Sequence, residues 1–182
     1  MKFIRRHLPD REAVRNHRYL AWAGDWLNHP NLWALNRDSV AGGFAIGLFS
    51  GLVPGPLQML TAALLAIPLK RNLPVALVTT LYTNPLTIGP LYVLAYGYGR
   101  LLLGASGHPP RVEPFVWNWS DWFASAEALV HWALALGKPL AVGLVALALT
   151  LAALGYFAVQ LGWRLYVRFA WRARARRRSA AK

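Results

Sequence analysis

Residues 139 to 163 read "PLAVGLVALALTLAALGYFAVQLGW", twenty-five consecutive residues without a charged side chain. About 20 apolar residues in a helix cross the ~30 Å hydrocarbon core of a bilayer, so this stretch predicts a membrane span. Pro139 suits the first turn of such a helix, and Trp163 suits the far membrane interface. We therefore expect an all-α membrane protein rather than an ordinary soluble domain.

The charges support this expectation because they lie mainly in the two tails. The chain has 20 Lys and Arg against 7 acidic residues, but only five basic residues fall between Ser39 and Lys138. A soluble protein that binds nucleic acid spreads its basic residues over a folded face, whereas membrane proteins frame uncharged stretches with charge. The absence of cysteine excludes disulfides and thiolate metal sites.

A second apolar stretch, "SVAGGFAIGLFSGLVPGPLQMLTAALLAIPLKR", covers residues 39 to 71 and centres on Pro54-Gly55-Pro56. Its arms, 40–53 and 57–69, are each shorter than the ~17 residues that a full span needs. We predict a re-entrant hairpin over 40–69, with one long, kinked and tilted span as the alternative.

Small residues line the first arm of this hairpin. Gly43, Gly47 and Gly51 recur every four residues, which places them on one helix face. Such small-xxx-small spacing lets helix backbones approach closely, so we expect this face to pack against another helix.

The next stretch, 73–103, is interrupted near its middle by "YTNPLTIGP". The residue before a proline avoids the α region, as an N-cap does, and proline at the first helical position loses no hydrogen bond. Asn84-Pro85 therefore predicts a helix start inside an apolar crossing. A competing layout makes 73–103 a second hairpin and moves 115–136 across the bilayer, at the cost of burying Asp121 and Glu127.

Polar or mixed segments complete the domain plan. Residues 1–38 are a basic N-terminal segment in which 11–36 predicts an amphipathic helix broken near His29-Pro30, lying on the membrane surface or on the protein itself. Residues 115–136 predict an interfacial helix that ends near Gly137. The tail 164–182 is strongly basic, and we expect it to contact anionic lipid headgroups rather than nucleic acid.

Because Lys and Arg stay on the cytoplasmic side, both termini are predicted to be cytoplasmic, with 39–163 forming a multi-pass inner-membrane domain.

The interrupted helices are the candidate functional site. Two Pro/Gly-broken apolar segments in succession indicate a binding site at mid-membrane, and helix N-termini there suit an anion. The candidate substrate-binding residues are Pro54, Gly55, Pro56, Gln58, Asn84, Pro85, Thr87 and Arg100. Alternatively, the breaks only let short helices turn and pack, with Asn84 and the threonines bonding the local backbone. No nucleophile elbow, P-loop, paired carboxylates or metal-ligand spacing occurs, so we expect neither an enzyme nor a cofactor.

The segments "LWALNRDSVAGGFAIGLFSGLVPGPLQM", "AIPLKRNLPVAL" and "TNPLTIGPLY" together resemble the bacterial membrane family known as domain of unknown function 2062. The resemblance covers roughly residues 10 to 160 and implies a small multi-pass inner-membrane protein, without any established activity or catalytic residue. Our leading hypothesis is transport or flipping of a small anionic substrate, such as a phosphate-bearing lipid. The alternative is an accessory subunit that docks a membrane protein or a second copy through its glycine face, and a third is nucleic-acid binding by the tails.

Overall fold

The structure of the chain, a computed structural model, describes residues 29–54, 57–104, 115, 118 and 120–179. All regular secondary structure within these ranges is helical, which confirms the predicted all-α class. The elements are a 3-10 turn η2 (Pro30–Leu32) and the helices α4 (Arg37–Ser50), α5 (Leu57–Ala66), α6 (Leu73–Thr80), α7 (Ile88–Leu102), α8 (Trp122–Ala135) and α9 (Gly137–Ser179).

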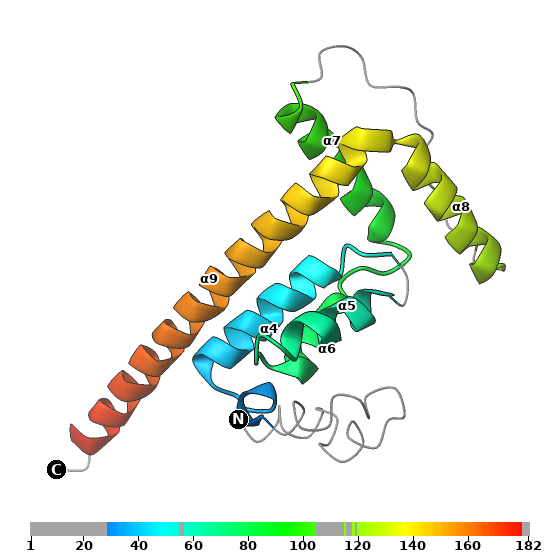
Figure 1. Cartoon of the computed structure of the whole chain (residues 1–182). Coiled ribbons are helices and arrows are strands. Elements are labelled where there is room, and N and C mark those ends of the chain that lie inside the picture. Colours follow the sequence, from blue (N-terminus) through cyan, green and yellow to red (C-terminus); the bar gives the residue numbers. More distant parts are fainter. Residues whose placement is uncertain (1–28, 55–56, 105–114, 116–117, 119, 180–182) are drawn as a thin grey trace.

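The long helix α9 is the axis of the molecule, and α4 and α7 both pack against it (Figure 1). Gln160 of α9 bonds Asp38 at the start of α4, and Gly155 lies against Leu48 further along α4. The two helices are therefore antiparallel. Near the other end of α9, Gly143 lies against Ala95 of α7. Two separate short helices thus accompany successive parts of one long helix.

The chain ends and restarts helices at both proline clusters, as the sequence predicts. α4 ends at Ser50 and α5 begins at Leu57, while α6 ends at Thr80 and α7 begins at Ile88. With 14 and 10 residues, α4 and α5 are roughly 21 and 15 Å long at about 1.5 Å per residue. Each is shorter than a full membrane crossing requires.

The α4–α5 hairpin returns to its own starting point. Lys70 adopts a left-handed φ of 53°, and the Arg71 amide donates to the Ala66 carbonyl at 3.0 Å, which turns the chain after α5. The Asn72 amide then donates to the carbonyl of Ser39 at 3.1 Å. The buried Asn72 side chain caps α6 by accepting from the amide of Val75 at 2.9 Å. The start of α4 and the start of α6 therefore lie together.

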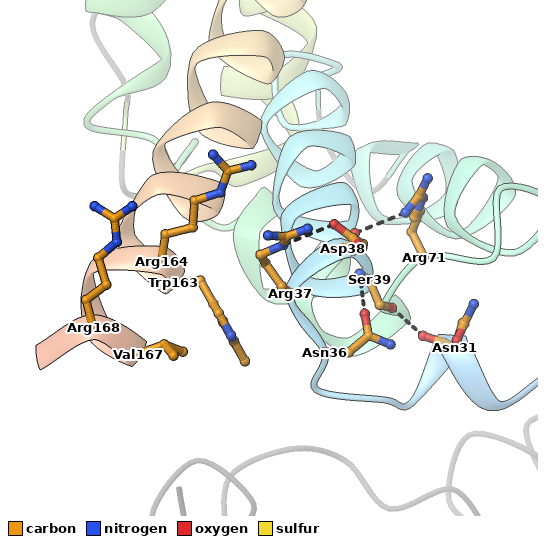
Figure 2. A pocket seen from close by; sticks show the side chains of 10 residues that line it. All are labelled: Asn31, Asn36, Arg37, Asp38, Ser39, Arg71, Trp163, Arg164, Val167 and Arg168. Carbon is orange, nitrogen blue, oxygen red and sulfur yellow. Dashed lines mark hydrogen bonds and ion pairs between the residues drawn. The ribbon is translucent and has the colours of Figure 1, made fainter. Parts of the chain in front are cut away.

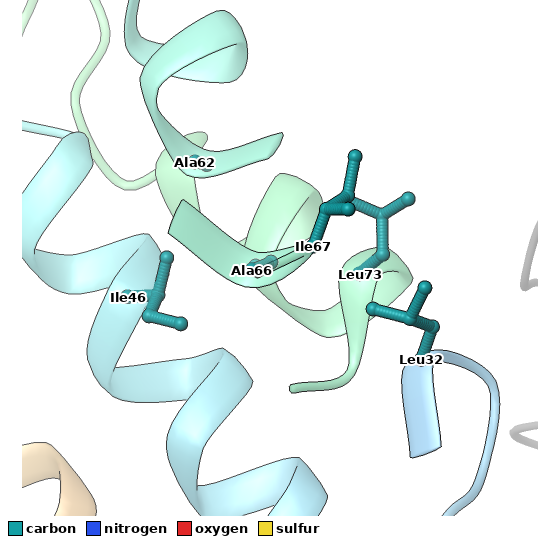
Figure 3. Packing of buried hydrophobic residues seen from close by; sticks show 7 residues of the cluster. Leu32, Ile46, Ala62, Ala66, Ile67 and Leu73 are labelled. Atoms are coloured by element: carbon teal, nitrogen blue, oxygen red, sulfur yellow. The ribbon is translucent and has the colours of Figure 1, made fainter. Parts of the chain in front are cut away.

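One apolar core holds α4, α5 and α6 together, as Figure 3 shows. Ala62, Ala66 and Ala76 are fully buried within it, because small side chains let three short helices approach closely. Leu32 of η2 is also fully buried there, and Trp33 packs on the same core. The described end of the predicted 11–36 helix is therefore corrected to a 3-10 turn that lies on the protein, while residues 11–28 lie outside the described part of the chain.

A second core joins α7, α8 and α9. The predicted 115–136 helix is corrected at its start, since α8 begins only at Trp122. Asp121 sets that boundary by accepting a hydrogen bond from the amide of Ala124 at 3.0 Å, as an N-cap does. The predicted end is confirmed: α8 stops at Ala135, and Gly137 has a φ of +61° that favours glycine.

One helix among the described residues is long and apolar enough to cross a membrane by length and composition alone. This is the Gly137–Trp171 part of α9. Its most apolar segment of 18 residues has a mean hydropathy of 2.3, and only 17% of that segment is buried within the chain. The helix does not stop at Trp163 but continues to Ser179, because no Gly or Pro interrupts 164–179 and Arg and Ala favour helix. The first part of the basic tail is thus an extension of α9.

Candidate functional site

The two interrupted segments contact each other directly. The Tyr82 hydroxyl donates to the carbonyl of Leu48 at 2.8 Å, and the Thr83 hydroxyl donates to the carbonyl of Gly51 at 2.5 Å. Both carbonyls belong to the end of α4, where helical partners run out. Side chains of the second break therefore satisfy backbone groups exposed by the first, which fixes the two breaks at the same level of the molecule.

A small cluster of buried polar groups surrounds this contact. Thr83 is 7% exposed and also lies 2.7 Å from Oε1 of Gln58. The single proton of the Thr83 hydroxyl serves the Gly51 carbonyl, so the Gln58 amide is satisfied when its NH₂ group points at Thr83 Oγ1. Thr80 is fully buried and donates to the carbonyl of Leu77 at 2.7 Å.

Ser50 belongs to the same region and differs from the others. Its hydroxyl is fully buried in the last turn of α4, and it has no hydrogen-bond partner among the described residues. A buried hydroxyl without a partner costs free energy, so the position is unusual in a well-packed helix. The sequence does not predict this buried hydroxyl, because Ser50 is one of several small residues in the glycine-rich arm.

Asn84 and Thr87 form a reciprocal cap that leads into α7. Asn84 Oδ1 accepts from the amides of Leu86 and Thr87 at 2.9 and 3.1 Å, while Thr87 Oγ1 accepts from the amide of Asn84 at 2.9 Å. The Ile88 amide then donates to the Asn84 carbonyl, so a single capped turn starts at Asn84. The predicted helix start at Asn84 is corrected, since α7 begins only at Ile88, with Thr87 in the N-cap position. These amides are the donors that the sequence assigns to an anion, and here the chain itself uses them.

The remaining candidate residues do not converge on one point. Pro54 lines an apolar cavity of about 430 Å³ between α7, α8 and α9, and Pro85 belongs to the Asn84 turn. Gly55 and Pro56 lie outside the described residues. Arg100 is in the last turn of α7, twelve positions from Ile88, which is roughly 18 Å along the helix. The structure therefore brings Gln58 to the break and leaves Arg100 at a distance.

The predicted packing role of the glycine face is confirmed within the chain. A Cβ added at Gly43, Gly47 or Gly51 would meet, respectively, the backbone of Asn72, the side chain of Thr79, or the ring of Tyr82, in each case closer than 3.0 Å. This face is covered by α6 and the segment that follows it. The sequence does not identify a closer contact, in which Gly99 of α7 and Gly143 of α9 meet backbone atoms of the opposite helix.

Charged residues gather at the opposite end of α4 from the breaks. Gln160 Nε2 donates to Asp38 Oδ1 at 2.7 Å, Arg37 Nε lies 3.4 Å from the same oxygen, and Arg71 Nη1 donates to the Asp38 carbonyl at 3.1 Å. The hydrogen bond from Gln160 lowers the pKa of Asp38, the positive charges of Arg37 and Arg71 act in the same direction, and desolvation opposes them. Sequence reasoning does not assign these residues to a site, although Arg37, Asp38 and Arg71 each flank an apolar stretch and Gln160 lies near the end of another.

The described residues hold no group of three or more His, Asp or Glu placed to bind a metal ion. Fold and site together define an all-helical protein built on one long apolar helix, with neutral hydrogen bonds at its helix breaks and charge at one end. The chain belongs to the bacterial family described as "Uncharacterized protein conserved in bacteria (DUF2062)", whose sequence model matches residues 20–172. That match confirms the resemblance carried by the three sequence segments. No curated protein and no solved structure matches the chain.

Proposed function

We propose that this chain is a multi-pass inner-membrane protein that moves a small anionic substrate, specifically a phosphate-bearing lipid, across the bilayer at its two helix breaks. The observation that carries the proposal is the buried polar cluster at the breaks. Ser50, Thr80 and Thr83 are each at least 93% buried, and they lie where backbone is irregular. In a bilayer, irregular backbone at depth is tolerated where protein or a cavity surrounds it, and such places form the substrate sites of many transporters.

The apolar surface of the short helices supports a bilayer around them as well as around α9. Leu60 of α5, Leu94 of α7 and Phe157 of α9 are 55, 63 and 67% exposed. A water-soluble monomer rarely exposes large apolar side chains on so many of its helices. We therefore place α4 and α5 in the membrane as a re-entrant hairpin, and α6 with α7 as one broken crossing.

The charge distribution gives this arrangement its orientation. Asp38, Arg71 and Gln160 lie together, so the starts of α4 and α6 are at the same level as the basic end of α9. Lys and Arg remain on the cytoplasmic side, which puts this end and both termini in the cytoplasm. At roughly 21 Å from that end, the break after Ser50 lies inside the ~30 Å hydrocarbon core.

Neutral hydrogen bonds suit a site through which an anion passes without being trapped. The Thr83 hydroxyl already bonds both Gly51 and Gln58, and Ser50 holds a hydroxyl with no described partner. A phosphate oxygen that enters the cluster accepts from Ser50 and from the Gln58 amide at the cost of one existing bond. Binding is therefore weak and reversible, as transfer between two leaflets requires.

The test is lipid movement in proteoliposomes that contain the purified full-length chain and a fluorescent phosphatidic acid. Ser50→Ala removes the hydroxyl that has no described partner, and Gln58→Ala removes the amide. We expect each variant to slow the transfer at least tenfold, about the effect of one lost hydrogen bond of 1.4 kcal/mol in the transition state.

Thr61→Val is the matched control, because the Thr61 hydroxyl bonds only the carbonyl of Leu57 in its own helix. This variant should move lipid at the wild-type rate. The proposal fails if the wild-type chain moves none of the anionic lipids tested. It also fails if folded Ser50→Ala and Gln58→Ala proteins move lipid as fast as the control.

A further inference from the structure

A cavity of about 720 Å³ lies at the charged end of the molecule, between α4, the turn after α5 and the last part of α9. Figure 2 shows Arg164 and Arg168 of α9 on one side, Arg37 and Arg71 on the other, and Trp163 between them. The lining also includes Asn31, Asn36, Asp38, Ser39 and Val167. The volume is in the range of small-molecule sites, which are about 300 to 1,000 Å³.

Positive charge dominates this cavity. Four guanidinium groups against the one carboxylate of Asp38 give the lining residues a net charge of +3 (four minus one). That carboxylate is already engaged by Arg37 and Gln160. Arg71 bonds the backbone carbonyl of Asp38 rather than its carboxylate. The charge of Arg71, Arg164 and Arg168 is therefore not matched by an acidic residue of the cavity.

The arginines come from three separate elements, α4, the turn after α5, and α9. The stem of Arg71 lies directly over Gly42, where any Cβ would collide with it, and its head is fixed by the Asp38 carbonyl. Arg164 and Arg168 are four residues apart on α9 and so lie on the same helix face. Guanidinium groups gathered around one space are typical of sites for phosphate, whose oxygens accept their paired N–H donors.

We infer that this cavity binds the phosphate-bearing headgroup of a membrane lipid. The lipid is favoured over a free phosphate because the cavity lies directly beside the apolar part of α9. Trp163 lines it, and the neighbouring Leu161 and Leu165 are 59 and 41% exposed, which offers acyl chains a surface next to the headgroup. The inference does not rest on lipid transport, since a headgroup can bind here whether or not the helix breaks move it.

The test measures, by isothermal titration calorimetry, how tightly dihexanoyl phosphatidic acid binds to the full-length chain in neutral detergent. The double variant Arg71→Gln, Arg164→Gln removes two cavity charges and should weaken binding roughly thirtyfold. The matched control, Lys70→Gln with Lys138→Gln, removes two charges outside the cavity lining and should weaken it less than about threefold. Circular dichroism establishes that both proteins retain their helix content.

A variant that binds the lipid more tightly cannot be explained by a loss of folding, and it therefore tests the site directly. Asp38→Asn removes the only acidic residue among the described residues that line the cavity, and it should tighten binding about threefold. Unchanged or weaker binding by a folded Asp38→Asn protein counts against the inference, as does an equal loss in the two double variants. Dihexanoyl phosphatidylcholine, which is zwitterionic, should bind at least tenfold more weakly. If inorganic phosphate alone binds as tightly as the phosphatidic acid, the ligand is a free phosphate and the lipid assignment is overturned.

Discussion

α7 and α4 both lie along α9, but the two contacts are built differently. Where α7 crosses α9, backbone meets backbone: a Cβ at Gly99 would collide with the Pro139 carbonyl, and one at Gly143 with the Ala95 carbonyl. Where α4 meets α9, Gly155 lies beneath the side chains of Leu48 and Phe44 instead. Polar side chains also link these two helices, through the hydrogen bond from Gln160 to Asp38.

The difference indicates which part of the molecule is fixed and which part is adjustable. Backbone atoms in contact have no rotamer to change, so the α7–α9 crossing has one geometry. Side chains such as Leu48 and Phe44 repack at moderate cost, so the α4–α9 contact tolerates small shifts. The α4–α9 contact also borders the basic cavity, and this is the contact that a ligand of that cavity is placed to alter.

Gly143→Ala should have the largest effect, because the new methyl group is forced into backbone on the opposite helix. Overpacking of this kind costs about 3 kcal/mol, the upper end of its usual range. The measurement is the midpoint of thermal unfolding of the purified chain in detergent.

Gly162→Ala provides the control for this substitution on the same helix. A Cβ at Gly162 meets nothing within 4 Å, so the change should stabilise the helix by as much as about 1 kcal/mol. Equal midpoints for the two variants would mean that α7 and α9 do not touch through their backbones.

Gly47→Ala should have the next largest effect, since α4 also packs tightly on its other side. The added Cβ would lie 2.5 Å from the Ala76 carbonyl oxygen and would also meet the Thr79 side chain. The Cβ of Thr79 is fixed by its backbone, so a rotamer change does not relieve this contact. Both contacts are longer than those at Gly143, however, and we expect a loss of about 2 kcal/mol in the same unfolding measurement. A stabilised Gly47→Ala protein would show that α4 and α6 are not packed along this glycine face.

Gly155→Ala tests the adjustable contact itself. The added methyl group meets only side-chain atoms of Leu48 and Phe44, and these side chains have other rotamers available. We expect a loss of about 1 kcal/mol, clearly less than for Gly143→Ala. If Gly155→Ala proves as damaging as Gly143→Ala, the α4–α9 contact is as rigid as the other and the comparison fails.

Local signals in the sequence predict where helices start and stop. Pro54-Gly55-Pro56 and Gly137 mark boundaries that the structure confirms, because capping and φ preferences act within a few residues. Asn84-Pro85 marks the turn that precedes α7, whereas the helix itself begins at Ile88. The N-terminal boundary of α8 is missed because the aromatic stripe begins at Phe115, ahead of the Asp121 cap that starts the helix. The pairing of α7 with α9 is harder to predict from the sequence. Gly99 and Gly143 are far apart in the chain, and neither belongs to a glycine repeat of its own helix.

For the candidate site, too, the sequence predicts local features but not contacts between distant residues. The sequence identifies the breaks and their polar residues, but it cannot show that Asn84 and Thr87 bond each other, or that Arg100 ends up distant from them. The basic cavity combines α4, the turn after α5 and α9, and among its arginines only Arg164 and Arg168 share a local spacing. Only their position at the ends of apolar stretches suggests that they meet, through the rule that keeps basic residues on one side of a membrane.

Gln160→Leu should have the smallest effect on stability and bears on the polar part of the α4–α9 contact. Gln160 is the main cause of the lowered pKa of Asp38, so its loss should raise that pKa towards the ordinary value of 3.8. A lowered pKa in the folded state stabilises the protein above pH 3.8, and this contribution is lost as the pH falls through the folded value. The wild-type unfolding midpoint should therefore fall more steeply below pH 3.8 than that of Gln160→Leu, whereas the two should differ little in slope near pH 7. If the two curves run parallel below pH 3.8, the Gln160–Asp38 hydrogen bond does not form. The apolar side chains at Gly155 would then hold α4 against α9 without it.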